Sequence, residues 1–314
     1  MTSIDLSVYI TTFNRPKFLL EAVESIECQG VSAKNIIVLD NNSDASMAMI
    51  SVKNQLKNRV TWKGSDVNND AWWNFERAFL DCQTEFMMVF HDDDRLVENF
   101  LKKQSLVLIS DPLISAISCN GFKIDNEGLR LDDYLIKNQH IKIKYLNNSA
   151  QVGLHSFNDS CIPPSPMIYR TSVVKKLVMI LKNNSKNFGQ TADVALSMLI
   201  ADAGILVLNM EPLYECRVHE NQDSSSMLIE SERYLRNYSM KHLNGDKTEL
   251  RMVTRAVKSN YTYSIIYSII KSIIALDIAK LIKICKCIDY AHLSPGGLLF
   301  FYKAMIEKVK IILK

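Results

Sequence analysis

Five apolar residues, Phe86–Phe90, run without a break into His91 and three consecutive aspartates. An uninterrupted apolar run of this length predicts a strand that is buried on both faces. Residues two apart in an extended chain share a face, so Asp92 and Asp94 are predicted to point the same way and Asp93 the opposite way. Two neighbouring carboxylates raise each other's pKa unless a cation or hydrogen bonds compensate, which favours a divalent metal site. The alternative is a solvated acidic turn whose first or second aspartate caps the next helix.

The chain before this strand alternates between apolar runs and helical patterns, and each apolar run ends in a polar loop. Pro16 suits the first position of the first helix, and Ser43 or Asp44 is expected to cap the second. Strands are expected at 6–12, 36–39 and 60–62, and helices at 16–26, 44–56 and 71–81. This alternation predicts an α/β fold with a parallel sheet covered by helices on both faces. Ligands bind beyond the carboxyl ends of such strands, where we expect the loops at Asn14, Asp40 and Asp92.

The second half of the chain is less regular. We expect helices at 97–109, 171–182 and 193–203, strands at 115–122, 205–208 and 212–217, and a loop or mobile flap at 130–151. Beyond Ser226 the pattern is helical, with many isoleucines and lysines. Charged residues interrupt residues 263–288 before they reach the roughly 20 apolar residues of a membrane span. We therefore expect a catalytic domain over 1–226 and a helical C-terminal region over 227–314. That region is predicted to lie on a membrane surface, with packing against the catalytic domain or a second subunit as the alternative.

Composition excludes some classes of protein and places the chain in a compartment. The net charge is only +3 over 314 residues, which gives no reason to expect a nucleic-acid partner. Seven cysteines form no CxxC pair and are odd in number, so reduced thiols are expected. The N-terminus lacks the basic and apolar segments of a secretory signal. These features predict a cytoplasmic protein.

Four stretches in this order resemble family 2 glycosyltransferases, the inverting sugar-nucleotide transferases of bacterial polysaccharide and O-antigen assembly. The stretches are Ser7–Pro16, Ile36–Asp44, Phe86–Asp94, and Thr191–Asp193 together with Arg217–His219. The resemblance spans about residues 4 to 226. It implies a GT-A fold, which is Rossmann-like with a mostly parallel sheet and flanking helices.

The resemblance also assigns a nucleotide-sugar site. The residues it implies are Thr12, Asn14, Arg15, Asp40, Asn74, Asp92 and Asp93. Their chemistry suits the ligand, because a carboxylate accepts from the ring N–H of uracil and an arginine can approach the ring or a phosphate. Asn68 and Asn69 lie where the family often has an asparagine-rich loop. Asp40 could instead be a simple turn residue, and Asn74 a residue of a helix surface.

For the metal, the resemblance implies Asp94 as a ligand, with Asp92 mainly on the ribose. His219 is a further candidate for the metal or the diphosphate, and Arg217 is expected to face phosphate. Oxygen ligands from carboxylate, diphosphate and water favour Mn²⁺ or Mg²⁺ over zinc. His91 occupies a position where many relatives carry another aspartate. We expect it to be a neutral structural residue and do not assign it to the metal.

Inversion needs a base for the acceptor hydroxyl, and the resemblance points to Asp193. In this chain Ala192 precedes it where the family more often has glutamate. A helix N-terminus keeps a carboxylate ionised, so a working base needs partial burial to raise its proton affinity. The alternative is that Asp193 only caps its helix.

The resemblance implies transfer of a hexose from UDP-glucose or UDP-galactose, with a β-linkage, to a lipid-linked sugar such as GlcNAc-diphosphoundecaprenol in O-antigen or capsule synthesis. The basic, isoleucine-rich tail supports a peripheral location at the inner face of the cytoplasmic membrane, because such an acceptor stays in the bilayer. Three alternatives remain open: a protein acceptor, a metal-dependent nucleotidyltransferase or phosphodiesterase, and an inactive sugar-nucleotide binder.

Overall fold

The computed structural model describes residues 3–137, 141–158, 162–182, 185–218 and 229–274. The strands are β1 Ser3–Thr12, β2 Ser32–Asp40, β3 Thr61–Gly64, β4 Phe86–His91, β5 Arg95–Leu96, β6 Ile114–Ile124, β7 Arg130–Tyr134, β8 Ile143–Leu146, β9 Met167–Arg170 and β10 Ile205–Arg217. The helices are α1 Pro16–Glu27, α2 Met47–Leu56, α3 Ala71–Asp81, α4 Phe100–Ser110, α5 Ser149–Asn158, α6 Thr171–Lys182, α7 Ser185–Phe188, α8 Ala192–Ala203, α9 Ile229–His242 and α10 Lys247–Ile274, with a short 3₁₀ turn at Gly189–Thr191.

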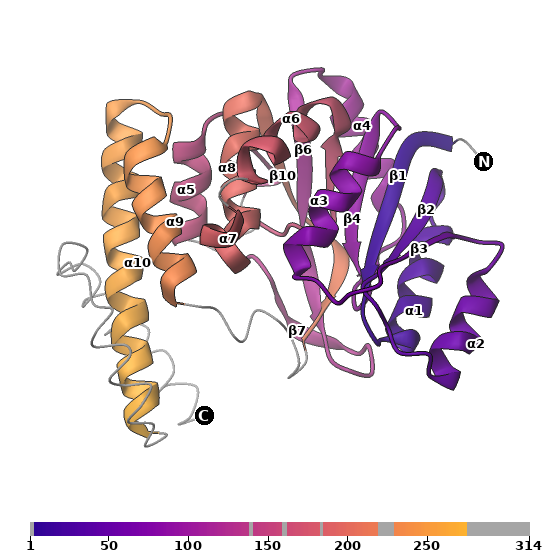
Figure 1. Ribbon diagram of the computed structural model, residues 1–314. Coiled ribbons are helices and arrows are strands. Elements are labelled where there is room, and N and C mark those ends of the chain that lie inside the picture. The colour runs from indigo at the N-terminus through magenta and orange to yellow at the C-terminus, as the bar shows by residue number, and fades with distance from the viewer. Residues whose placement is uncertain (1–2, 138–140, 159–161, 183–184, 219–228, 275–314) are drawn as a thin grey trace.

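The described strands form one twisted sheet (Figure 1), with the order β3-β2-β1-β4-β9-β6-β10-β5 and with β7 beside β6 and β8 beside β10. The first half is parallel, because β1 pairs with both β2 and β4 in the same direction. The predicted α/β class with flanking helices is therefore confirmed. The sheet is mixed rather than wholly parallel, since β9 runs antiparallel to both of its neighbours, β4 and β6.

Alternating side chains of the central strands divide the core into two layers. In β4, Phe86, Met88 and Phe90 pack on one face, with α1, α2 and α4. Met87 and Val89 pack on the other face, with α3, α6 and α8. Every one of these five side chains is at most 3% exposed, so β4 is buried on both faces as its uninterrupted apolar sequence predicts.

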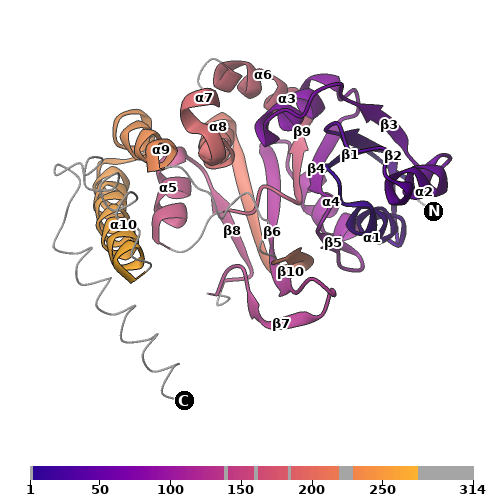
Figure 2. The same ribbon diagram turned by 60° about the horizontal axis from the view of Figure 1, so that its bottom comes forward.

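Three helices, α5, α9 and α10, form a further layer beyond α8 (Figures 1 and 2). Phe188 packs edge-on against Tyr234 and Tyr238 of α9, and Val253 and Val257 of α10 pack on α5. Leu235 belongs to the same core cluster as one face of the sheet. The described helices of the C-terminal region, α9 and α10, therefore pack on α7, α5 and one core cluster of the sheet.

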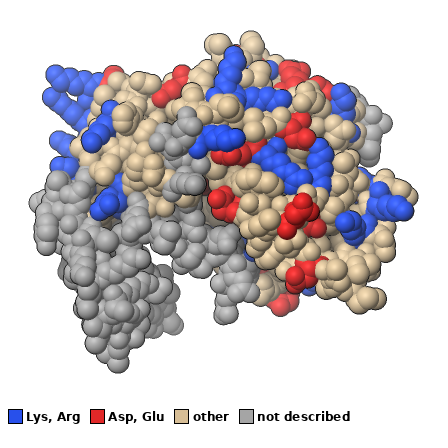
Figure 3. All heavy atoms as spheres, in the orientation of Figure 1, with Lys and Arg blue, Asp and Glu red and all other residues tan. Residues whose placement is uncertain are grey.

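The C-terminal layer carries a basic end. Lysine and arginine side chains gather at the upper left of Figure 3, over the part of this layer where α10 begins. Lys247, Arg251 and Arg255 are exposed on the first turns of α10. None of the described helices is long and apolar enough to cross a membrane. Of the predicted isoleucine-rich surface helix at 263–288, residues 263–274 form the end of α10, and 275–288 lie outside the described residues.

Two predictions about secondary structure were wrong. Residues 130–151 contain β7, β8 and the start of α5 instead of a loop or flap. β7 is largely exposed on both faces, so it lacks the apolar alternation by which a strand is recognised. The two strands expected between 205 and 217 are one strand, β10, whose register shifts on either side of Pro212. Proline cannot donate to a ladder and is accommodated at such irregularities.

Helix starts also differ from the prediction. Ser46 caps α2, accepting from the backbone N–H of Met49 at 3.2 Å, because Ser43 and Asp44 are engaged with the neighbouring loop. The helix expected from Val97 begins at Phe100, because the Val97 N–H donates to the carbonyl of Leu213 in β10. Four cysteines in the described residues are free thiols, as expected: Cys28, Cys82, Cys119 and Cys216.

Candidate functional site

Three polar loops meet at the carboxyl edge of the parallel strands. Thr12 at the end of β1 lies opposite Asp40 at the end of β2, and Thr11 lies opposite His91 at the end of β4. Parallel pairing in register brings these three strand ends to one edge of the sheet. The loops at Asn14, Asp40 and Asp92 therefore lie where the sequence places them.

Thr12 and Arg15 are tied directly to the acidic loop. The Thr12 hydroxyl donates to Asp92 Oδ2 at 2.6 Å. Arg15 Nη1 donates to Asp92 Oδ1 at 3.1 Å and to Asp93 Oδ2 at 2.9 Å. The first strand and its loop thus hold one side of the aspartate cluster in place, and the guanidinium partly balances its charge.

Asn14 and Asp40 shape the neighbouring loop. Asn14 has a backbone φ of 55°, a left-handed conformation that asparagine tolerates better than most residues. Its side chain donates to Asp44 Oδ2 at 3.2 Å and accepts from the Asp44 N–H at 2.7 Å. Asp40 accepts from the Ser43 N–H at 2.8 Å and from Trp62 Nε1 at 3.3 Å. A carboxylate can accept more than two hydrogen bonds, so Asp40 can hold this loop and still accept from a ligand.

The aspartates are buried and repel one another. Burial, and then the charge of Asp93, raise the pKa of Asp92 to about 7, although Arg15 and Thr12 act in the opposite direction. Burial and the charge of Asp93 also raise the pKa of Asp94 well above its usual range. A bound cation would offset the burial and the mutual repulsion of these carboxylates and so stabilise their charged forms.

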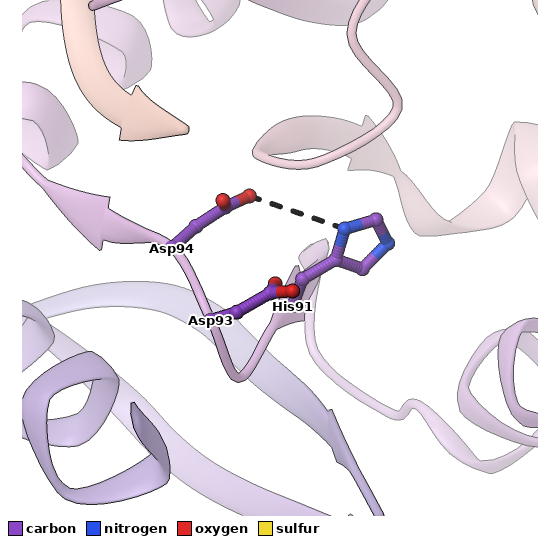
Figure 4. A group of neighbouring side chains, drawn as sticks. All are labelled: His91, Asp93 and Asp94. Carbon is purple, nitrogen blue, oxygen red and sulfur yellow. Dashed lines mark ion pairs between the residues drawn. The ribbon is translucent and has the colours of Figure 1, made fainter. Parts of the chain in front are cut away.

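The ligand atoms of His91, Asp93 and Asp94 lie within 4.8 Å of one another (Figure 4), and His91 Nδ1 is 3.9 Å from Asp94 Oδ2. The prediction that Asp92 and Asp94 share a face was wrong. β4 ends at His91 and the chain then turns, so the alternation of an extended strand no longer applies. Asp92 instead faces Thr12 and Arg15. One imidazole nitrogen and two carboxylates form a donor set that fits a divalent cation such as Mn²⁺.

Ser165 supports this cluster and could not be recognised from the sequence. Its hydroxyl accepts from the backbone N–H of His91 at 3.1 Å and lies 3.4 Å from Asp94 Oδ2, to which it donates. It sits in the loop before β9, which pairs with β4. A serine between prolines carries no local signal for this role, because the contact depends on how β9 is inserted into the sheet.

Arg217 lies at the site but not as expected. Its side chain is 0% exposed, and its backbone N–H donates to Asp94 Oδ1 at 3.1 Å. The guanidinium donates to the carbonyls of Asp93, Asp125 and Asn126 and to Glu21. We expected a phosphate-facing group, whereas this guanidinium faces main-chain carbonyls and the carboxylate of Glu21. Arg217 is therefore a positioning residue for the acidic loop. His219 lies outside the described residues.

Asp193 stands in the first turn of α8, half-buried, and its Oδ1 accepts from the N–H of Val194 at 2.8 Å. Burial, followed by the charge of Asp193, raises the pKa of Tyr169. The Tyr169 hydroxyl donates to the carbonyl of Pro164 at 3.4 Å, next to Ser165. The charge of Asp193 therefore acts on Tyr169, whose hydroxyl contacts the loop that carries Ser165.

Asn74 of α3 is 3% exposed, and its Oδ1 is buried with no hydrogen-bond partner among the described residues. Buried amide oxygens are almost always paired in folded proteins. The next residue, Phe75, packs edge-on against the ring of His91, with centroids 6.1 Å apart. Asn74 is therefore a buried acceptor one residue before the phenylalanine that contacts His91, and a bound ligand could satisfy it.

Comparison with known families identifies the chain. The family model described as "Glycosyl transferase family 2" matches residues 7–178, from β1 through most of α6. The chain belongs to glycosyl transferase family 2. The match covers the loops of Thr12 and Asp40, the acidic cluster and Ser165, so this glycosyltransferase carries its cluster inside the family's own domain.

A solved structure shows that this family 2 enzyme has a GT-A-like fold. A crystal structure of S. aureus TarS residues 1–349 in complex with UDP-GlcNAc matches at 15% identity with a TM-score of 0.58, covering 90% of this chain and 79% of that one. The same TarS fragment in complex with UDP matches at 16% identity with a TM-score of 0.46, covering 90% of each chain. No curated protein sequence matches this family 2 glycosyltransferase.

Proposed function

We propose that this glycosyltransferase is an inverting, metal-dependent hexosyltransferase with a UDP-sugar donor. The observation that carries the proposal is the convergence of the loop of Thr12 and Arg15, the loop of Asp40 and the acidic cluster at one sheet edge. Carboxyl edges of parallel strands are where nucleotides bind in such folds. The TarS structure of similar fold is a complex with UDP-GlcNAc, which supports a UDP-sugar donor here.

The residues of the site divide the work between holding the donor and accepting a proton. Asp40 is proposed to accept from the N–H of uracil, and the Asn74 amide oxygen to accept from the bound nucleotide or sugar. Asp92 is proposed to accept from the ribose, with Thr12 and Arg15 fixing its orientation. Asp93 and Asp94 would hold Mn²⁺ or Mg²⁺, and the bound cation would stabilise the charge on the departing diphosphate. The Asp193 carboxylate is proposed to take the proton of the acceptor hydroxyl as that oxygen attacks the anomeric carbon from the face opposite the diphosphate.

For the acceptor, we propose a lipid-linked sugar such as GlcNAc-diphosphoundecaprenol, used at the inner face of the cytoplasmic membrane in O-antigen or capsule synthesis. The support is the basic end of α10, where Lys247, Arg251 and Arg255 are exposed, together with the isoleucine-rich sequence that follows. Basic side chains beside apolar ones favour an anionic bilayer surface. UDP-glucose and UDP-galactose are the proposed donors, with a β-linkage in the product.

The test is a donor and acceptor screen of the purified full chain. UDP-glucose, UDP-galactose and their N-acetyl forms are each combined with a synthetic GlcNAc-diphospholipid, with Mn²⁺, with Mg²⁺ or with chelator. We expect one donor to give both UDP release and glycolipid formation, and we expect chelator to abolish both. Transfer to a peptide acceptor without transfer to the lipid acceptor would show that the acceptor is a protein and not a lipid-linked sugar. Absence of UDP release from every donor would contradict the UDP-sugar transferase itself.

A further inference from the structure

We infer that His91 is a ligand of the catalytic metal, so that this enzyme uses a nitrogen-containing site selective for Mn²⁺ or Co²⁺ over Mg²⁺. The inference rests on the proposed metal-dependent function and adds to it. From the sequence alone His91 is expected to be structural, yet the structure gathers its ring with two carboxylates.

The direction of the His91 side chain follows from the strand that carries it. Along β4, Met87 and Val89 point to the face covered by α3, and His91 continues that alternation. Phe75 of α3 then packs against the ring edge-on. The backbone N–H of His91 is held by the Ser165 hydroxyl at 3.1 Å. Strand, aromatic neighbour and serine together fix the imidazole at the start of the acidic turn.

The distances suit a shared cation. A divalent ion with bonds of about 2.1 Å holds its ligand atoms roughly 3 to 4 Å apart. His91 Nδ1 and Asp94 Oδ2 are 3.9 Å apart, and Asp93 completes a set within 4.8 Å. Figure 4 shows the three side chains converging from one turn. The His91 side chain is 40% exposed, which leaves one side of the set open to solvent or to a diphosphate.

The other polar contacts around the cluster leave this set in place. Arg15 bonds Asp93 through Oδ2, and the Arg217 N–H bonds Asp94 through Oδ1. The Asp94 oxygen that lies towards His91 is Oδ2, which also accepts from Ser165 at 3.4 Å. Arg217 therefore orients Asp94 through Oδ1, and Ser165 supports the oxygen that lies towards His91, as the supporting contacts of metal ligands usually do.

The nitrogen ligand has a consequence for metal choice. Affinity for a site of nitrogen and oxygen ligands rises from Mn²⁺ through Fe²⁺ to Co²⁺ and Ni²⁺, whereas Mg²⁺ favours oxygen ligands and keeps several waters. An aspartate at position 91 would give an all-carboxylate set. The histidine in this chain therefore lowers affinity for Mg²⁺ relative to Co²⁺ and Mn²⁺.

The experiment reads the ligand directly, without turnover. Electron spin echo envelope modulation of the full-length protein loaded with Mn²⁺ and UDP detects nitrogen bound to the metal. We expect ¹⁴N modulation in the wild type that disappears in His91→Asn and His91→Asp. His242→Asn, an exposed histidine of α9, is the matched control and keeps the signal. His91→Asp should still bind Mn²⁺, and its Co²⁺ to Mg²⁺ affinity ratio should fall about tenfold.

The outcomes separate the inference from the function on which it rests. Bound Mn²⁺ without nitrogen modulation in the wild type overturns the His91 assignment and leaves metal-dependent transfer standing. Modulation that survives His91→Asn and disappears in His219→Asn overturns it as well. A wild-type protein that binds no Mn²⁺ contradicts both the assignment and the proposed metal dependence.

Discussion

Glu21 of α1 and Arg217 at the end of β10 form an ion pair of 2.6 Å, although 196 positions separate them in the sequence. The Arg217 side chain is 0% exposed and that of Glu21 is 24% exposed. The same guanidinium bonds the carbonyl of Asp93 at 2.9 Å. One buried arginine thus links the first helix, the acidic loop and the last described strand.

Breaking this pair should destabilise the protein. Glu21→Ala leaves a buried guanidinium without its carboxylate, although three backbone carbonyls still accept from it. We expect a loss of about 1 to 3 kcal/mol in the free energy of unfolding, measured by urea denaturation.

The matched control is Glu27→Ala at the end of the same helix. Glu27 pairs with Arg59 at the surface, with both side chains about one third exposed. Surface pairs contribute about 0 to 1 kcal/mol, so this variant should remain close to the wild type. Equal losses in the two variants would contradict the special position of Arg217.

Asp94→Asn should remove activity and weaken metal-dependent UDP binding. Asp94 is buried and oriented by Arg217 and Ser165, so the amide can occupy the same space without supplying a charge. Calorimetry of UDP binding with and without Mn²⁺ is the measurement. We expect the difference between the two conditions to vanish in the variant. A preserved Mn²⁺ effect on UDP binding would exclude Asp94 as a ligand.

Asp193→Asn should separate chemistry from binding. Loss of a general base typically lowers kcat by about 10² to 10⁴-fold. UDP affinity in the presence of Mn²⁺ should stay unchanged, because Asp193 is proposed to act on the acceptor hydroxyl and not on the nucleotide. Asp202→Asn, near the end of the same helix, serves as the control. Wild-type turnover in Asp193→Asn would remove it from the role of base.

The start of α10 gives a pH prediction. Asp246 and Glu249 form a reciprocal cap, in which Asp246 Oδ1 accepts from the Glu249 N–H at 2.8 Å and Glu249 Oε2 accepts from the Asp246 N–H at 2.9 Å. The side chain of Gln151, then the Asp246 N–H, hold the pKa of Glu249 below its usual 4.5. The lowered pKa means that Glu249 contributes stability above pH 4.5 and loses it as pH falls through the folded-state pKa.

Glu249→Ala should therefore cost about 1 kcal/mol near pH 7 and less near pH 3.5. Unfolding followed by circular dichroism at both pH values measures the difference. Lys247 is an exposed neighbour on the same helix, and Lys247→Ala should not show a stability loss that shrinks between about pH 7 and pH 3.5. A Glu249→Ala deficit that stays constant with pH would contradict the role of the carboxylate charge.

The C-terminal residues can be tested by a truncation chosen from the structure. Tyr261 and Ile265 are buried in the helical layer, so a chain ending after Ile274 keeps the packed part of α10. We expect this variant to hydrolyse UDP-sugar like the full chain and to lose cosedimentation with vesicles that contain anionic lipid. Equal vesicle binding of the two proteins would place the membrane contact within residues 1–274, which keep the basic end of α10.

The sequence predicted those features that depend on local pattern. Phe86–Phe90 could be recognised as a doubly buried strand from its composition, and Pro16 marked the first helix correctly. The convergence of the loops of Thr12, Asp40 and His91 followed from the rule that parallel strands end at one edge.

Features that depend on distant contacts could not be predicted in this way. The turn after His91 is stabilised by Arg217 and Ser165, which lie far along the chain, so strand alternation alone misplaced Asp92. No local sequence pattern predicts the role of Glu21, because its partner Arg217 comes near it only when β10 is placed beside β6 in the sheet. β7 was missed because a strand exposed on both faces has no apolar period.

The dependence of Asp94 on Arg217 also sets an order of events during synthesis. Domains fold as the chain emerges from the ribosome, N-terminal parts first. The strands that carry Thr12, Asp40 and His91 emerge early, but β9 inserts between β4 and β6, and Arg217 closes the site from the end of β10. A nascent chain that stops before Arg217 therefore carries all three aspartates but lacks the Arg217 bonds to Asp93 and Asp94. Metal and nucleotide binding should thus be acquired late in translation, after more than two thirds of the chain has left the exit tunnel.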